Sequence, residues 1–158
     1  MGSIDTIATI AVILHILSAV VWVGGMFFAV LVLRPATGPM EPPARLELWG
    51  RVLGGFFRWV FAAIVLLLAS GYAMVFGVFG GFPNVGLHVH IMQGIGILMM
   101  LAFFHLYFAP WRRYQAALGR RDYPAAAAQL GQIRAIVIVN LVLGLATIAI
   151  GSSGRYWG

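Results

Sequence analysis

The sequence predicts an all-α integral membrane protein, a bundle of four transmembrane helices, and three observations support this. Of the 158 residues, 62% are hydrophobic. Only 9% are charged, whereas a soluble globular domain carries about a quarter. Four long apolar stretches alternate with segments rich in proline, glycine or arginine. A soluble core of this size could not hide so much apolar surface, so the lipid bilayer is the expected partner.

The helices are expected in a single membrane domain, residues 1–158, at about 6–33, 58–79, 86–109 and 124–151. The first stretch contains no charged side chain. As a helix it would be about 42 Å long, more than the ~30 Å hydrocarbon core. Arg34-Pro35 is expected to end the first helix, and Pro110 the third. Pro124 behind Asp122 suits the first turn of the fourth helix.

The arginines predict the orientation of the bundle. Nine of the ten lie in, or at the edges of, the first and third connections. The turn at 80–84 has none, and the tails hold only Arg155. Because cytoplasmic loops carry the excess of positive charge, we expect these two connections in the cytoplasm and both termini on the other side. The net charge of +6 is thus a topology signal, and no nucleic-acid partner is expected.

Missing residue types exclude several kinds of chemistry. The chain has no cysteine, which excludes disulfides and thiolate metal sites. No aspartate or glutamate lies within an expected span. This argues against a proton relay built on carboxylates. It also argues against a serine hydrolase, because no acid could orient the base.

Four histidines are the candidate functional residues, since an ionisable side chain inside a membrane often serves a function. His15 lies 19 residues before Arg34, roughly 28 Å along a helix. His90 lies 22 residues before Arg112, roughly 33 Å. These two rings are therefore expected at one depth in the outer half of the bilayer. His88 lies slightly further out, and His105 lies on the cytoplasmic side.

Two imidazoles at one depth on different helices suit the axial ligation of haem b. We therefore expect His15 and His90 to bind haem iron, in a protein that moves electrons to or from a quinone or a periplasmic redox partner. His105 and His88 are further candidate ligands for haem iron or copper. Whether a substrate is turned over, as in a membrane oxidoreductase, and whether the chain forms a homo-oligomer stay open.

Simpler and alternative interpretations apply to the same residues. A lone intramembrane histidine often only hydrogen-bonds a neighbouring helix. His88-Val89-His90 could chelate copper at the surface, but two helical positions point about 200° apart, so chelation by both rings needs extended backbone. Methionines such as Met92 would suit copper, yet they are scattered and commonly fill apolar bundles.

Three short motifs resemble the CopD and HemJ-like group of small membrane proteins. Residues 14–25 place Trp22 seven positions after His15 and follow it with Gly24-Gly25. Residues 104–107, Phe-His-Leu-Tyr, precede a basic loop. Residues 134–144 begin with Arg and end in Asn-Leu-Val-Leu-Gly. Together these motifs extend over most of the chain.

The resemblance implies a helical bundle in a bacterial inner membrane. HemJ-type members are associated with haem b and protoporphyrinogen oxidation, and CopD-type members with copper handling. His15 matches the helix-1 histidine proposed to ligate haem. The HemJ pattern has a lysine early in the third helix, where this chain has His90 or Gln93 and no lysine anywhere. This departure argues against protoporphyrinogen oxidase activity, which nevertheless stays an alternative together with copper binding or transport of the CopD type, while haem ligation is the first interpretation.

Overall fold

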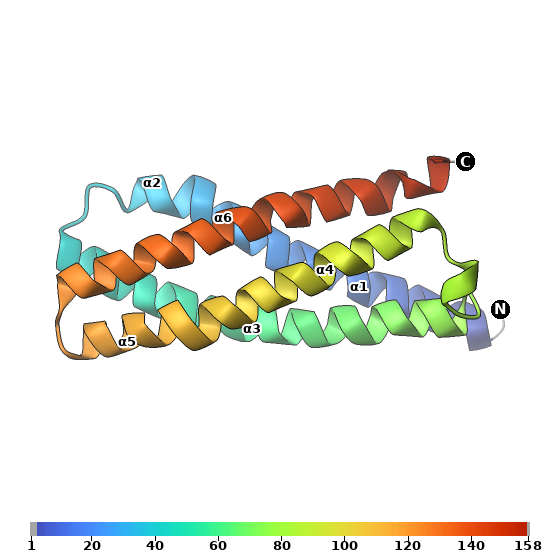
Figure 1. Ribbon diagram of the computed structural model, residues 1–158, viewed down its shortest axis with the longest axis horizontal. Coiled ribbons are helices and arrows are strands. Elements are labelled where there is room, and N and C mark those ends of the chain that lie inside the picture. Colours follow the sequence, from blue (N-terminus) through green and yellow to red (C-terminus); the bar gives the residue numbers. More distant parts are fainter. Residues whose placement is uncertain (1–2, 158) are drawn as a thin grey trace.

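The described chain, residues 3–157, is helical nearly throughout and contains no strand (Figure 1). This structure is a computed structural model, and it leaves out the side chains of residues 3–5 and 155. Residues 1, 2 and 158 of the predicted domain, and the side chain of Arg155, therefore lie outside the described residues. Four helices are long and apolar enough to cross a membrane. The prediction of an all-α, four-helix membrane protein is confirmed.

The first two spans form a hairpin. The first consists of α1 (Ser3–Phe28), the π-helical turn η1 (Ala29–Leu33) and the short α2 (Arg34–Ala36), joined end to end. A short connection leads to α3 (Pro42–Gly77), a single helix of 36 residues. At 1.5 Å per residue α3 is about 54 Å long, so it extends well beyond the hydrocarbon core.

The last two spans form a second hairpin. A turn containing η2 (Phe82–Asn84) leads into α4 (Leu87–Leu106), which continues through the π-helical turn η3 (Tyr107–Trp111) into α5 (Arg112–Gly119). The last span is α6 (Tyr123–Ser153), followed by η4 (Gly154–Tyr156). Asp122 caps α6 by accepting a hydrogen bond from the backbone N–H of Ala125 at 3.1 Å, and Pro124 stands in its first turn as predicted.

Pro110 does not end the third span, and that prediction was wrong, because the helix passes Pro110 into α5. The first span ends at Ala36, one residue beyond Pro35, close to the end expected at Arg34-Pro35. A π-helical turn precedes Pro35, and another contains Pro110. Proline lacks the N–H of the ordinary helical bond and crowds the preceding turn. One extra residue in the turn accommodates that defect without breaking the helix.

The bundle has two chemically different ends (Figure 1). Both described ends of the chain lie at one end of the long axis, together with the turn that contains η2. The two arginine-bearing connections, with α2 and α5, lie at the other. The shared side of the two termini agrees with the predicted topology, while the assignment of that side to the non-cytoplasmic face stays a prediction.

An aromatic core holds the arginine-bearing half together. The Phe57 ring is edge-on to Phe103 at 5.6 Å and to Trp111 at 5.0 Å between centroids. The Phe61 ring is edge-on to Tyr107 at 4.8 Å. Edge-to-face pairs at these separations are favourable arrangements of aromatic rings. They join α3 to α4 and η3 in this half of the molecule.

Small residues allow the helices to pack closely beyond the aromatic core. Helix α1 packs along α3, and α4 packs along α6. A β-carbon at Gly144 of α6 would lie 2.7 Å from Val23 Cγ2 of α1, so the close approach of these helices requires glycine. One turn before it, the side-chain amide of Asn140 donates to the Met99 carbonyl of α4 at 3.0 Å. Helix α6 is thereby fixed against both α1 and α4.

Candidate metal-binding site

His15 lies inside the bundle, half-buried, in the contact between α1 and α3. Its Nδ1 is 3.0 Å from the hydroxyl oxygen of Ser70. A β-carbon at Gly71 would lie 3.4 Å from His15 Cε1, so the ring rests on the glycine surface of α3. Because Ser70 is buried, the histidine and the serine are natural partners in an apolar environment.

The surroundings of Ser70 indicate how the His15 ring is protonated. The Ser70 hydroxyl lies 2.5 Å from the Leu66 carbonyl, which can only accept a hydrogen bond. The serine proton is therefore used, and we assign the second bond as His15 Nδ1–H donating to Ser70. In this tautomer Nε2 carries the free lone pair. A histidine held through one nitrogen, with the other nitrogen free, has the arrangement of a metal ligand.

His90, in α4, lies near a different side of α3 from the side that His15 contacts. Its ring is exposed and 6.1 Å from the Phe82 ring between centroids. One turn further along α4, Gln93 Nε2 donates to the Tyr72 hydroxyl at 3.2 Å. Since Tyr72 is two positions after Ser70, these contacts lie about 200° apart around α3. The described contacts do not bring His15 and His90 together, and their pairing on one haem stays a prediction.

His88 is directed away from His90, toward α6. Both histidines are in the first turn of α4, so the extended backbone that a His-Val-His chelate requires is not formed. A β-carbon at Gly154 would overlap the His88 ring, and the Trp157 ring lies 6.4 Å away between centroids. His88 is therefore seated against the end of the chain, in the part of the bundle where both termini lie (Figure 1).

Met92 is the neighbour of His88 on the same face of α4. A β-carbon at Gly151 would lie 2.7 Å from Met92 Cε and 2.9 Å from its sulfur. The two side chains are four residues apart, one helical turn, and cover two glycines of one short segment, 151–154. An imidazole and a thioether thus lie side by side over α6 and η4, and this is a donor pair that Cu(I) accepts.

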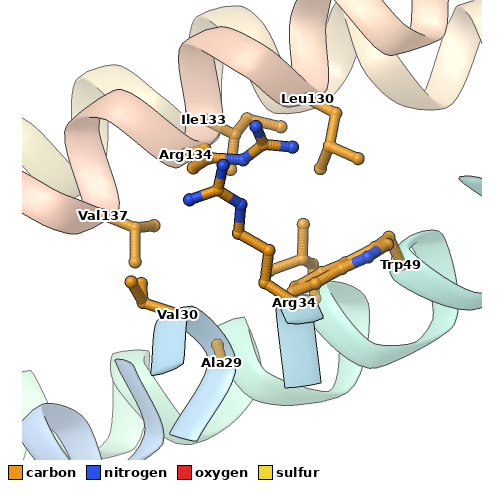
Figure 2. A pocket seen from close by; sticks show the side chains of 9 residues that line it. Ala29, Val30, Arg34, Trp49, Leu130, Ile133, Arg134 and Val137 are labelled. Atoms are coloured by element: carbon orange, nitrogen blue, oxygen red, sulfur yellow. The ribbon is translucent and has the colours of Figure 1, made fainter. Parts of the chain in front are cut away.

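His105 is not part of a binding site formed by the described side chains. His105 is exposed on the outward side of α4 in the arginine-bearing half, and the described structure gives it no polar contact. No cluster of three or more His, Cys, Asp or Glu exists among residues 3–157. Two cavities lie away from these histidines, beside Arg34 (Figure 2).

Two functional candidates were not recognised as such in the sequence. Ser70 was not singled out, and Met92 was treated as one of several scattered methionines. The spacing His88-x-x-x-Met92 would have identified the pair, because positions i and i+4 share a helix face. The role of Ser70 depends on the register between α1 and α3, which no local pattern contains.

The fold and these side chains define a class: a small multi-pass membrane protein with histidines in and beside its spans. A family model described as "Copper resistance protein D" (CopD) matches residues 50–153. This match includes most of α3 and all of α4, α5 and α6. The chain belongs to the CopD family, which confirms the resemblance. No curated protein and no solved structure was found to match it.

Proposed function

We propose that this protein binds copper in the membrane, as a first step in copper handling, through His88 and Met92. The observation that supports this most directly is that both side chains pack on one short segment, Met92 on Gly151 and His88 on Gly154. The pair combines the two soft or intermediate donor types available in a chain without cysteine. Membership of a family described by copper resistance supports the same metal.

His15 is the second donor of the proposal, deeper in the bundle. Ser70 holds its Nδ1 at 3.0 Å, which leaves Nε2 for a metal. His90 is exposed in the same first turn of α4 but is directed away from His88, so it is not part of the proposed outer site. A route for copper would then lead from the outer end toward His15, with the aromatic core closing the other half.

The experiment is a metal analysis of the detergent-purified protein from cells supplied with both copper and haem precursors. We expect near-stoichiometric copper in the wild type and a large loss in His88→Ala and in Met92→Leu. His105→Ala is the matched control, because it removes an exposed histidine of the same helix outside the site. Copper retained in both site variants, or lost equally in His105→Ala, would contradict the assignment.

Haem b is the second candidate, and the orientation of His15 is the observation that favours it. An axial histidine of haem is commonly fixed through its other nitrogen in the same way. Electron transfer with a quinone or periplasmic partner, and any oxidoreductase activity, belong to this alternative. With His90 as the second ligand, the helices would have to rearrange, because the described contacts do not bring the two rings together. A red protein with a b-type spectrum that is lost in His15→Ala would establish haem binding.

A further inference from the structure

Three arginines surround a cavity at the arginine-bearing end of the bundle, remote from the histidines. The cavity measures about 310 Å³ and lies between α2, the first turns of α3, and α6. Arg34, Arg45 and Arg134 line it, and no acidic residue does. Its volume is several times the ~30 Å³ that one water takes in the liquid. A charged group of several atoms would therefore fit.

The guanidinium groups of Arg34 and Arg134 point toward each other from η1–α2 and α6 (Figure 2). Neither makes a hydrogen bond or an ion pair within residues 3–157, and the guanidinium of Arg45 donates only to the Gly38 carbonyl, at 3.2 Å. Like charges facing one another destabilise the empty site. An anion between them would remove this repulsion and use the free donors, which the guanidinium group presents in a fork.

The chain has no carboxylate to spare for these arginines. Its four acidic residues are Asp5, Glu41, Glu47 and Asp122. Asp5 belongs to the first turn of α1, at the opposite end of the bundle. Glu47 accepts from the Tyr123 hydroxyl at 3.2 Å, and Asp122 caps α6. Glu41, exposed directly before α3, is not among the residues that line the cavity. An anion that neutralises the cavity would therefore come from outside the described chain.

The wall of the cavity is held in a fixed arrangement. Trp49 Nε1 donates to Thr37 Oγ1 at 3.2 Å, and the Thr37 hydroxyl donates to the Arg34 carbonyl at 3.1 Å. Thr37 is 4% exposed and Trp49 is 9% exposed, so both are part of the packed structure. The backbone that carries Arg34 is thus fixed relative to α3.

A small apolar cavity of about 30 Å³ adjoins the charged one and shares four of its lining residues, Arg34, Trp49, Leu130 and Arg134. Its other walls are apolar, formed by Ala29, Val30, Leu53, Ile133 and Val137 (Figure 2). A ligand with a charged head and an apolar continuation would match both. Basic pockets between helices at the membrane surface bind the head groups of anionic lipids.

We infer that Arg34, Arg45 and Arg134 form a binding site for a phosphate group, carried by an anionic phospholipid or by a soluble phosphate. The inference is independent of copper or haem binding, because it uses none of the histidines. The two sources share the chemistry of bidentate guanidinium–phosphate contacts. They differ in whether an apolar chain must accompany the head group.

The test is native mass spectrometry of the delipidated full-length protein with three probes: phosphatidylglycerol, phosphatidylcholine and inorganic phosphate. We expect phosphatidylglycerol to bind in preference to phosphatidylcholine, and Arg34→Gln/Arg134→Gln to weaken it roughly thirtyfold. Arg58→Gln/Arg112→Gln is the control, since it removes the same charge from exposed positions outside the cavity. Arg45→Gln, in the first turn of α3, is a milder variant should the double change impair folding.

Each outcome decides the inference. Cavity-dependent binding of phosphatidylglycerol alone supports the lipid source, and cavity-dependent binding of inorganic phosphate supports a soluble one. An equal loss in the cavity and control variants would show a general charge effect and overturn the site. Binding of neither anion, or binding unchanged in Arg34→Gln/Arg134→Gln and in Arg45→Gln, would overturn it as well.

Discussion

At the scale of single residues, the environment of each histidine differs more than its place in the sequence suggests. His15 and His90 lie at one expected depth, but the first contacts Ser70 and the second lies beside Phe82. His88 and His90 are two residues apart and are directed to different helices. Depth follows from helical rise alone, whereas the direction of a side chain depends on how neighbouring helices are packed.

The first prediction concerns the seat of His88. Gly154→Ala should displace the imidazole, because the new β-carbon would overlap the ring. If His88 and Met92 bind Cu(I), its affinity should fall about tenfold or more, as for other changes that misorient a metal ligand. Competition with a chromophoric Cu(I) chelator measures this. Gly96→Ala is the control, since open space surrounds that position on α4, and an equal affinity in both variants would refute the seat.

At the scale of elements, the positions of the helices could be predicted from the sequence more accurately than their ends. Hydropathy identifies all four spans, because each is a long apolar stretch. Each is helical, because a segment inside the membrane must satisfy its own backbone hydrogen bonds. Pro110 misled the prediction of the third helix's end, because a π-helical turn accommodates this proline. The second helix was expected to begin at 58, whereas α3 begins at Pro42.

The second prediction compares two glycines of α6. Gly144→Ala should destabilise the protein by about 1–3 kcal/mol, because the added methyl group would press on Val23 in a packed contact. Gly131→Ala should be neutral or stabilising by up to about 1 kcal/mol, because alanine favours helix and nothing lies within 4 Å. Unfolding in mixed micelles measures both changes. Equal effects would show that α1 and α6 do not approach as closely as described.

At the scale of the whole molecule, chemistry is divided between the two ends of the bundle. The end with both termini carries His88 and Met92, and the other carries the arginine cavity and the aromatic core. The sequence analysis found this polarity, because arginine distribution and histidine depth are both readable along the chain. It missed the cavity, since Arg34 and Arg134 are a hundred residues apart and were interpreted only as a topology signal.

The third prediction concerns the orientation of the chain in the membrane. The chain has no cysteine, so single variants carry one thiol each. A membrane-impermeant maleimide added to intact spheroplasts should label Pro83→Cys, which is exposed in the turn before α4. Gln115→Cys, exposed on α5, should react only after permeabilisation, because the arginine-rich end is expected in the cytoplasm. The reverse pattern would invert the topology.

The most direct test of copper binding by His88 and Met92 is X-ray absorption at the copper edge of the Cu(I)-loaded protein. The wild type should show both a nitrogen and a sulfur shell around the metal, as an imidazole and a thioether would supply. Met92→Leu should lose the sulfur shell while His105→Ala keeps it. A spectrum without sulfur in the wild type, or one unchanged in Met92→Leu, would contradict the assignment.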